Sequence, residues 1–156
     1  MSSTETNNVI EVLFNDCYGG FGISKEALKR YNQKLVAANP SAVPHKYGYN
    51  IHRTDPLLLE VYHEMDGRNC KKGEGFNDSY SKTMICKINK KYENYFFISE
   101  YDGLETLDIR YHKYEIDEMR RIAKDETLSF EERINQINQL KVEFQQMDCQ
   151  EDEGDD

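Results

Sequence analysis

The chain has 156 residues, of which 38% are hydrophobic and 31% charged, enough for one folded domain with its own core. Its formal net charge of −9 at pH 7 disfavours broad binding to the phosphate backbone of nucleic acids. It has no apolar signal segment and no apolar run of the roughly 20 residues that a membrane span needs. Its four cysteines lack the spacing of a zinc knuckle or a redox pair, so we expect an acidic cytoplasmic protein with free thiols.

The first predicted elements are a strand and a helix. Residues 1–8 are polar and are expected to form a disordered N-terminus. The apolar run at 9–14 contains β-branched residues and predicts a strand. Ser24 is a good N-cap and apolar residues recur at helical spacing after it, so a helix is predicted over 25–37.

A second helix is predicted after a connection at 38–50, which contains two prolines and a glycine. Asp55 is the expected cap of this helix and Pro56 its first residue. Gly67 is expected to end it. A polar loop then follows at 68–80, and its two glycines favour mobility.

The next part of the chain predicts strands. Residues 82–88 alternate between apolar and polar types, and residues 94–100 are expected to be their antiparallel partner. Asp102 and Gly103 form a hairpin signal, so a further strand is expected after them. The spacing of apolar residues at 104–114 fits both a strand and a helix, and the two interpretations stay open.

The C-terminal part changes character. Residues 115–125 are expected to be helical, and Ser129 with Glu132 predicts a capping box at the start of an amphipathic helix that reaches residue 147. Residues 148–156 contain six acids and no base, which predicts a disordered acidic tail. The apolar stripe of the amphipathic helix consists of Phe130, Ile134, Ile137, Phe144 and Met147.

Together these elements predict an α+β fold. A small, mainly antiparallel sheet with two packing helices would form a core domain over residues 9–114. A helical extension would follow over residues 115–147, and the acidic tail would come last.

The most unusual segment is the loop NDCYGGFGIS at residues 15–24. Its three glycines lie within four positions, between a predicted strand and a predicted helix. Glycines permit close approach to the backbone, and free amides at a helix start favour an anion. The segment matches neither the phosphate-binding loop pattern with its lysine nor the dinucleotide fingerprint. The alternative is a tight strand-to-helix turn in which Phe21 fills the core.

Side chains elsewhere could complete an anion site. Arg53 could bind a phosphate bidentately or form a salt bridge with a nearby acid. Asp102 and Glu105 could hold a divalent cation, which favours a magnesium nucleotide as ligand, whereas Asp102 could instead cap its own turn. Cys17 is either a nucleophile at a helix start or a buried structural thiol. The predicted ligand-binding residues are Asn15, Asp16, Cys17, Gly19, Gly20, Ser24, Arg53, Asp102 and Glu105.

Three motifs in order, NDCYGGFGIS, RTDPLLLEVYHEM and FFISEYDGLE, resemble a family of small uncharacterised proteins of tailed bacteriophages and large DNA viruses. The resemblance covers residues 9–113 and implies a viral protein, but it implies no activity and no catalytic residue. The loop at 68–80 is more polar and lysine-rich than in the family, and the segment at 115–156 is an addition. The matching positions are Asn15, Cys17, Tyr18, Gly19, Gly20, Phe21, Ser24, Arg53, Asp55, Pro56, Tyr101, Asp102, Gly103 and Glu105.

Two functional hypotheses follow. In the first, an intracellular viral protein of the host cytoplasm binds a small anionic ligand, a nucleotide or phosphate, at the loop 15–24. This hypothesis requires the loop, Arg53 and the hairpin at 101–105 to meet in space. In the second, a non-enzymatic interaction module docks a partner or a second copy through the helix at 130–147. The sequence assigns no catalytic residue, no metal ligand and no resident cofactor.

Overall fold

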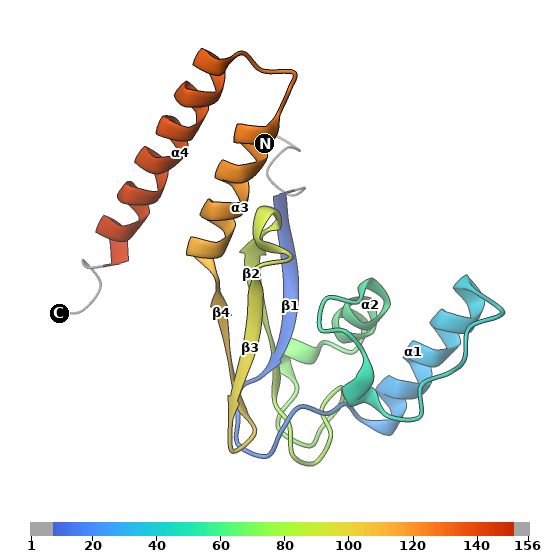
Figure 1. Cartoon of the computed structure of the whole chain (residues 1–156). Helices are drawn as coiled ribbons and strands as arrows, with labels where there is room; N and C mark the ends of the chain where they lie inside the picture. Colours follow the sequence, from blue (N-terminus) through green and yellow to red (C-terminus); the bar gives the residue numbers. More distant parts are fainter. Residues whose placement is uncertain (1–7, 152–156) are drawn as a thin grey trace, which may run out of the picture. The chain divides into compact units, whose positions relative to one another are not determined.

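The computed structural model of the chain describes residues 8–151, with side chains described to residue 147 (Figure 1). The fold is α+β, as predicted, with antiparallel strands and α-helices. The chain divides into two units, Met1–Ile109 and Arg110–Asp156. The boundary lies five residues before the predicted one, because the helix expected from residue 115 begins earlier.

Two antiparallel ribbons replace the single predicted sheet in the first unit. Strand β1 (Val9–Asn15) pairs with β2 (Thr83–Asn89), and β3 (Phe96–Tyr101) pairs with β4 (Leu104–Ile109). The predicted pairing of residues 82–88 with 94–100 is therefore wrong. A 3-10 turn, η4 (Lys90–Tyr92), separates these strands, so no tight hairpin brings them together.

The turn between β3 and β4 confirms the hairpin signal. Asp102 and Gly103 both have positive φ, 49° and 86°, as a two-residue turn of the primed type requires. Residues 104–109 are consequently a strand and not a helix. Glu105 lies on the same face as Ile98 and Leu107, which are half-buried, whereas the opposite face is mostly exposed.

The caps of both helices in this unit form as predicted. The Ser24 side chain accepts a hydrogen bond from the Ala27 amide at the start of α1 (Lys25–Ala38). Asp55 accepts from the amides of Leu57 and Leu58 at the start of α2 (Pro56–Glu64), where proline occupies the first turn. These bonds satisfy amides that the helix itself leaves unpaired. Figure 1 shows α1 and α2 lying on one side of β1.

The core of the first unit is formed by β1, both helices and three connecting segments. Phe76, from the loop that the sequence marks as polar, is fully buried and packs edge-on against Tyr62. Burial raises the pKa of Tyr31 to about 12, and its hydroxyl donates to Asp55. The buried cluster comprises Leu13, Ile23, Ala27, Tyr31, Ile51, Leu58, Val61, Tyr62 and Phe76.

The second unit is a pair of helices, α3 (Tyr111–Lys124) and α4 (Phe130–Glu151). Ile122 and Phe144 are buried, and Ser129 Oγ accepts from the Glu132 amide, which confirms one half of the predicted capping box. Helix α4 continues four residues beyond the predicted end at 147, because no helix breaker occurs before Gly154. The rest of the predicted acidic tail, at 152–156, lies outside the described residues.

Candidate functional site

Three distant segments meet at the glycine loop. The Gly19 amide donates to the Asp102 carbonyl at 3.0 Å, and a Cβ at Gly103 would overlap the backbone nitrogen of Gly20. The Arg53 guanidinium carbon lies 3.5 Å from the centre of the Phe21 ring. The loop, Arg53 and the hairpin are therefore in contact, as the anion-site hypothesis requires. We refer to Asn15, Gly19, Gly20, Arg53, Gly103 and Glu105 as the loop–hairpin junction.

Asn15 holds the loop–hairpin junction together from a fully buried position. Its Nδ2 donates to the carbonyls of Cys17 and Gly103, both at 2.7 Å. Its Oδ1 accepts from the Lys82 amide at 2.9 Å. Its backbone amide donates to Glu105 Oε1 at 2.7 Å. Every polar group of this side chain is thus bonded inside the protein, as a buried amide requires.

Arg53 and Glu105 form a bidentate ion pair, with N–O distances of 2.6 and 2.9 Å. The Glu105 side chain is only 7% exposed and that of Arg53 20%. The structure thus shows the salt bridge that the sequence analysis gave as the alternative for Arg53. The guanidinium lies over the ring of Phe21, which also packs against the core. Two donors of the guanidinium are therefore already engaged, and an anion at Arg53 would have to compete with the Glu105 carboxylate.

The other predicted ligand-binding residues differ in whether their side chains already have hydrogen-bond partners. The Ser24 hydroxyl is used as a helix cap. The Cys17 thiol lies 3.3 Å from Asn15 Oδ1 and 3.4 Å from the Tyr80 carbonyl oxygen, so its single proton has two acceptors within reach. Asp16 and Asp102 are exposed, and their carboxylates make no hydrogen bond or ion pair with any described residue. A ligand-binding role for these residues stays a prediction.

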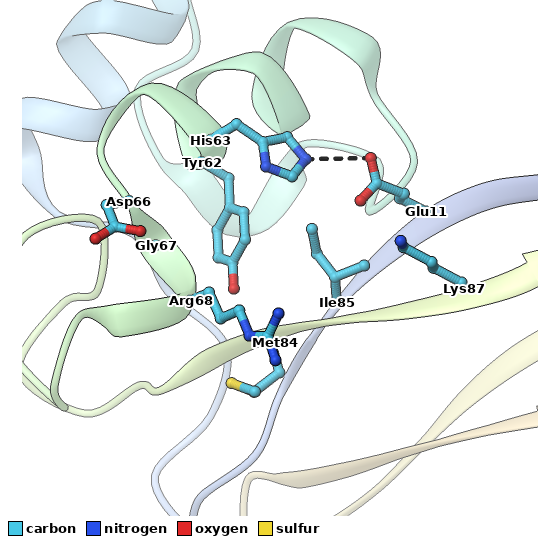
Figure 2. Close-up of a pocket in the computed structure, with 9 residues that line it drawn as sticks. All are labelled: Glu11, Tyr62, His63, Asp66, Gly67, Arg68, Met84, Ile85 and Lys87. Carbon is cyan, nitrogen blue, oxygen red and sulfur yellow. Dashed lines mark hydrogen bonds and ion pairs between the residues drawn. The ribbon is translucent and has the colours of Figure 1, made fainter. Parts of the chain in front are cut away.

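A separate pocket of about 440 Å³ lies in the first unit, between α2, the turn after it and the β1–β2 ribbon (Figure 2). We call it the α2–ribbon pocket. Glu11 and Lys87 are directly opposite each other in the strand register, and His63 stands near the end of α2. Arg68 belongs to the 3-10 turn η3 (Gly67–Asn69), which Asp66 begins in a left-handed conformation with φ of 52°.

The charges of the α2–ribbon pocket are unequally paired. His63 Nε2 lies 3.1 Å from Glu11 Oε1, as the dashed line in Figure 2 marks. The Asp66 carboxylate accepts from Asn69 Nδ2 at 2.9 and 3.1 Å. Arg68 and Lys87, in contrast, make no hydrogen bond or ion pair with the part of the chain that is described. Two permanent cations therefore line the pocket without a direct ion pair, beside the carboxylates of Glu11 and Asp66.

The remaining lining is neutral. Met84, Ile85 and the ring of Tyr62 provide the uncharged part of the wall. The Tyr62 hydroxyl donates to the Thr83 carbonyl at 3.1 Å, and burial raises the pKa of Tyr62 to about 12, so the hydroxyl is neutral at physiological pH. Figure 2 shows this hydroxyl and the Arg68 guanidinium pointing into the same part of the pocket.

The α2–ribbon pocket was missed in the sequence because its residues meet only through the β1–β2 pairing. Once β2 is paired with β1, Lys87 stands beside Glu11, and Ile85 lies two residues away on the same face. A usable signal was His63, which directly follows the apolar residues Val61 and Tyr62 but is itself exposed. Without knowledge of the strand pairing, an exposed histidine alone does not predict a pocket.

The apolar stripe predicted on the C-terminal helix is partly buried and partly exposed in the structure. Within the second unit, Phe144 is 8% exposed and its ring lies 6.1 Å from that of Tyr114. Ile137 and Met147 are half-buried, whereas Phe130 and Ile134 are 78% and 42% exposed. An interaction module built on this helix would therefore have the beginning of the stripe, not all of it, available to a partner.

Comparisons of the chain with protein-family models, curated proteins and solved structures found no match. The resemblance to a viral family and the cytoplasmic location thus stay predictions. Within residues 8–147, no group of three or more histidine, cysteine, aspartate or glutamate side chains is arranged to hold a metal ion. In the same part of the chain, no helix combines the length and apolar character needed to cross a membrane.

Proposed function

We propose that the protein binds a small anionic ligand in the α2–ribbon pocket. The observation that carries this proposal is that Arg68 and Lys87 line one concavity and neither has an internal partner. An anion bound between Arg68 and Lys87 would gain two ionic contacts, against the repulsion of the Glu11 and Asp66 carboxylates that line the same pocket. Hydrogen bonds between ionised partners are also stronger than those between neutral ones.

The lining indicates the class of ligand. A guanidinium matches the planar, two-oxygen geometry of a carboxylate or phosphate, whereas an ammonium acts as a point charge. The pocket volume of about 440 Å³ falls within the range of about 300–1,000 Å³ that is usual for small-molecule sites. Met84 and Ile85 offer contacts to an apolar body. The proposed ligand is therefore a metabolite-sized carboxylate or phosphate ester with an apolar portion.

This proposal keeps the anionic ligand that the sequence predicts, but it assigns the ligand to the α2–ribbon pocket instead of the glycine loop. At the loop–hairpin junction, Arg53 is already bonded to Glu105, so a ligand there would have to compete with a buried ion pair. In the α2–ribbon pocket, no bond of Arg68 or Lys87 has to be broken. A magnesium nucleotide at the loop stays the competing prediction.

The test is an amide NMR titration of the full chain at low ionic strength. Benzoate and phenyl phosphate serve as probes, and benzyl alcohol provides the same ring without a charge. We expect the two anions to shift the signals of His63, Arg68 and Lys87, and benzyl alcohol to bind more weakly. Arg68→Gln and Lys87→Gln should each weaken binding of the anions about tenfold, since a hydrogen bond to a charged group contributes about 1.5–3 kcal/mol.

Lys29→Gln is the matched control, because Lys29 is an exposed lysine on α1 that lines a different surface. It should leave the affinity unchanged. Gly20→Ala separates the two sites: if it abolishes binding while Arg68→Gln does not, the loop is the ligand site. Equal binding of benzoate by the wild-type chain and by both pocket variants would refute the proposal.

A further inference from the structure

Three exposed tyrosines stand around the glycine loop. The exposed fractions of Tyr18, Tyr80 and Tyr101 are 59%, 66% and 73%. The segments that carry them meet at Gly19, whose amide bonds the carbonyl of the residue after Tyr101. A Cβ at Gly19 would lie 3.1 Å from the Cβ of Tyr80, so the missing side chain lets that segment approach closely. Three segments that meet therefore each carry a large exposed ring, and exposed aromatic rings are typical of interaction surfaces.

Two acids stand among these rings. Asp16 and Asp102 are exposed, and their carboxylates have no hydrogen-bond or ion-pair partner in residues 8–147. The Lys72 ammonium donates to the Tyr18 carbonyl at 3.2 Å and forms no ion pair with either carboxylate. We refer to Tyr18, Tyr80, Tyr101, Asp16 and Asp102 as the tyrosine surface.

We propose that the tyrosine surface binds arginine side chains of a partner peptide. A guanidinium is attracted to the face of an aromatic ring and pairs with a carboxylate through two parallel hydrogen bonds. The neighbouring loop–hairpin junction shows the same chemistry inside the chain, because Arg53 lies over the Phe21 ring at 3.5 Å while it pairs with Glu105. The free carboxylates would repel a phosphate backbone, which favours a basic peptide over a nucleic acid as the occupant.

The experiment is an amide NMR titration of the full chain with the peptide acetyl-GRGRGRG-amide. The same peptide with lysine in place of arginine, the same peptide with glutamate, and an oligothymidylate are the comparison probes. We expect the shifts to concentrate at Tyr18, Gly19, Gly20, Tyr101 and Asp102. The arginine peptide should bind several-fold more tightly than the lysine peptide, since a planar guanidinium stacks on rings where an ammonium does not.

Two double variants separate the contribution of the rings to peptide affinity from that of the carboxylates. The double variant Y18A/Y101A should weaken binding of the arginine peptide about five- to tenfold, because each exposed ring contributes a few-fold. D16N/D102N should weaken it and remove most of its salt dependence, and asparagine tolerates the positive φ at residue 102. Tyr49→Ala is the control, because Tyr49 is 61% exposed but its ring stacks on Tyr47, which is not part of the tyrosine surface.

Three results would overturn the proposal. The first is equal affinity of the arginine and lysine peptides together with shifts spread over all acidic residues, which would indicate attraction to net charge alone. The second is full binding of the arginine peptide by Y18A/Y101A when its spectrum shows that it is folded. The third is tighter binding of the oligothymidylate at the same signals, which would identify a base-stacking surface instead.

Discussion

Glu105→Ala removes the carboxylate that joins β1, Arg53 and the hairpin. Glu105 accepts two bonds from Arg53 and one from the Asn15 amide while it is only 7% exposed. Removing it leaves the Arg53 charge without a partner and the buried amide unpaired. Breaking a buried pair from one side typically costs about 3–5 kcal/mol. We expect the free energy of unfolding of the first unit to fall by about that amount.

A double-mutant cycle tests whether this loss comes from the pair itself. Arg53→Ala alone should cost a similar amount, because it leaves the Glu105 carboxylate buried with one remaining bond, from Asn15. The double variant R53A/E105A leaves no buried charge, so its loss should be smaller than the sum of the single losses by about 2–3 kcal/mol, at the upper end for contacting residues. Lys34→Ala is the control, because the Lys34 pairs with Glu60 and Glu64 are exposed and should contribute little.

Urea unfolding should be followed by the amide NMR signals of β1 and β4, because the second unit could unfold separately. For a unit of this size, a loss of about 3 kcal/mol also corresponds to a fall in Tm of roughly 12–20 °C. Single variants that each cost less than about 1 kcal/mol, or losses that simply add in the double variant, would refute the reasoning. The junction would then be held by Asn15 and the backbone contacts alone.

Three further predictions concern the backbone, the buried tyrosines and the C-terminus. Gly19 and Gly20 both have positive φ, 122° and 97°, but only Gly19 is crowded, since its Cβ would lie 2.6 Å from a backbone oxygen. Gly20→Ala should therefore cost about 1 kcal/mol and Gly19→Ala clearly more in urea unfolding, and the opposite order would contradict the packing at the loop. Burial raises the pKa values of Tyr31 and Tyr62 to about 12. The neutral hydroxyls therefore stabilise the fold fully below pH 10, and this stabilisation is lost as pH rises through 12. The free energy of unfolding should fall between pH 8 and pH 12, and it should fall less steeply in Tyr31→Phe. Truncation after Met147 should leave Tm nearly unchanged, because residues 148–156 contain no apolar residue except Cys149, and a fall of several degrees would show that the removed segment packs.

Local signals predicted the boundaries of most elements. Ser24, Asp55 and Pro56 each act on amides within their own first helical turn, so their effect can be read without knowing the rest of the fold. Asp102 and Gly103 set a two-residue turn in the same local way. The convergence of the loop, Arg53 and the hairpin was also anticipated, although from the resemblance and the chemistry of the residues rather than from spacing.

Non-local pairing is what the sequence did not determine. The partner of β2 is β1, about 70 residues away along the chain, and the alternation of β2 alone fits either neighbour equally well. The apolar spacing at 104–114 suits both a strand and a helix, and the pairing of β4 with β3 decides for the strand up to Ile109. The α2–ribbon pocket depends on the first of these pairings, so it could not be found before the strands were placed.

Burial explains why the chain's two groups of charges differ. At the loop–hairpin junction, Glu105 is 7% exposed, and an unpaired charge there would be costly, so every charge is bonded within the protein. In the α2–ribbon pocket, Arg68 and Lys87 are exposed, where water can solvate them at little cost to folding. Charges that the fold does not need to pair are the ones available to a ligand.

The same reasoning applies to Asp16 and Asp102. Their carboxylates are exposed and take no part in the hydrogen bonds of the neighbouring loop–hairpin junction. Exposure and the absence of an internal partner, rather than proximity to the glycine loop, are therefore the grounds on which we propose these residues as ligand contacts.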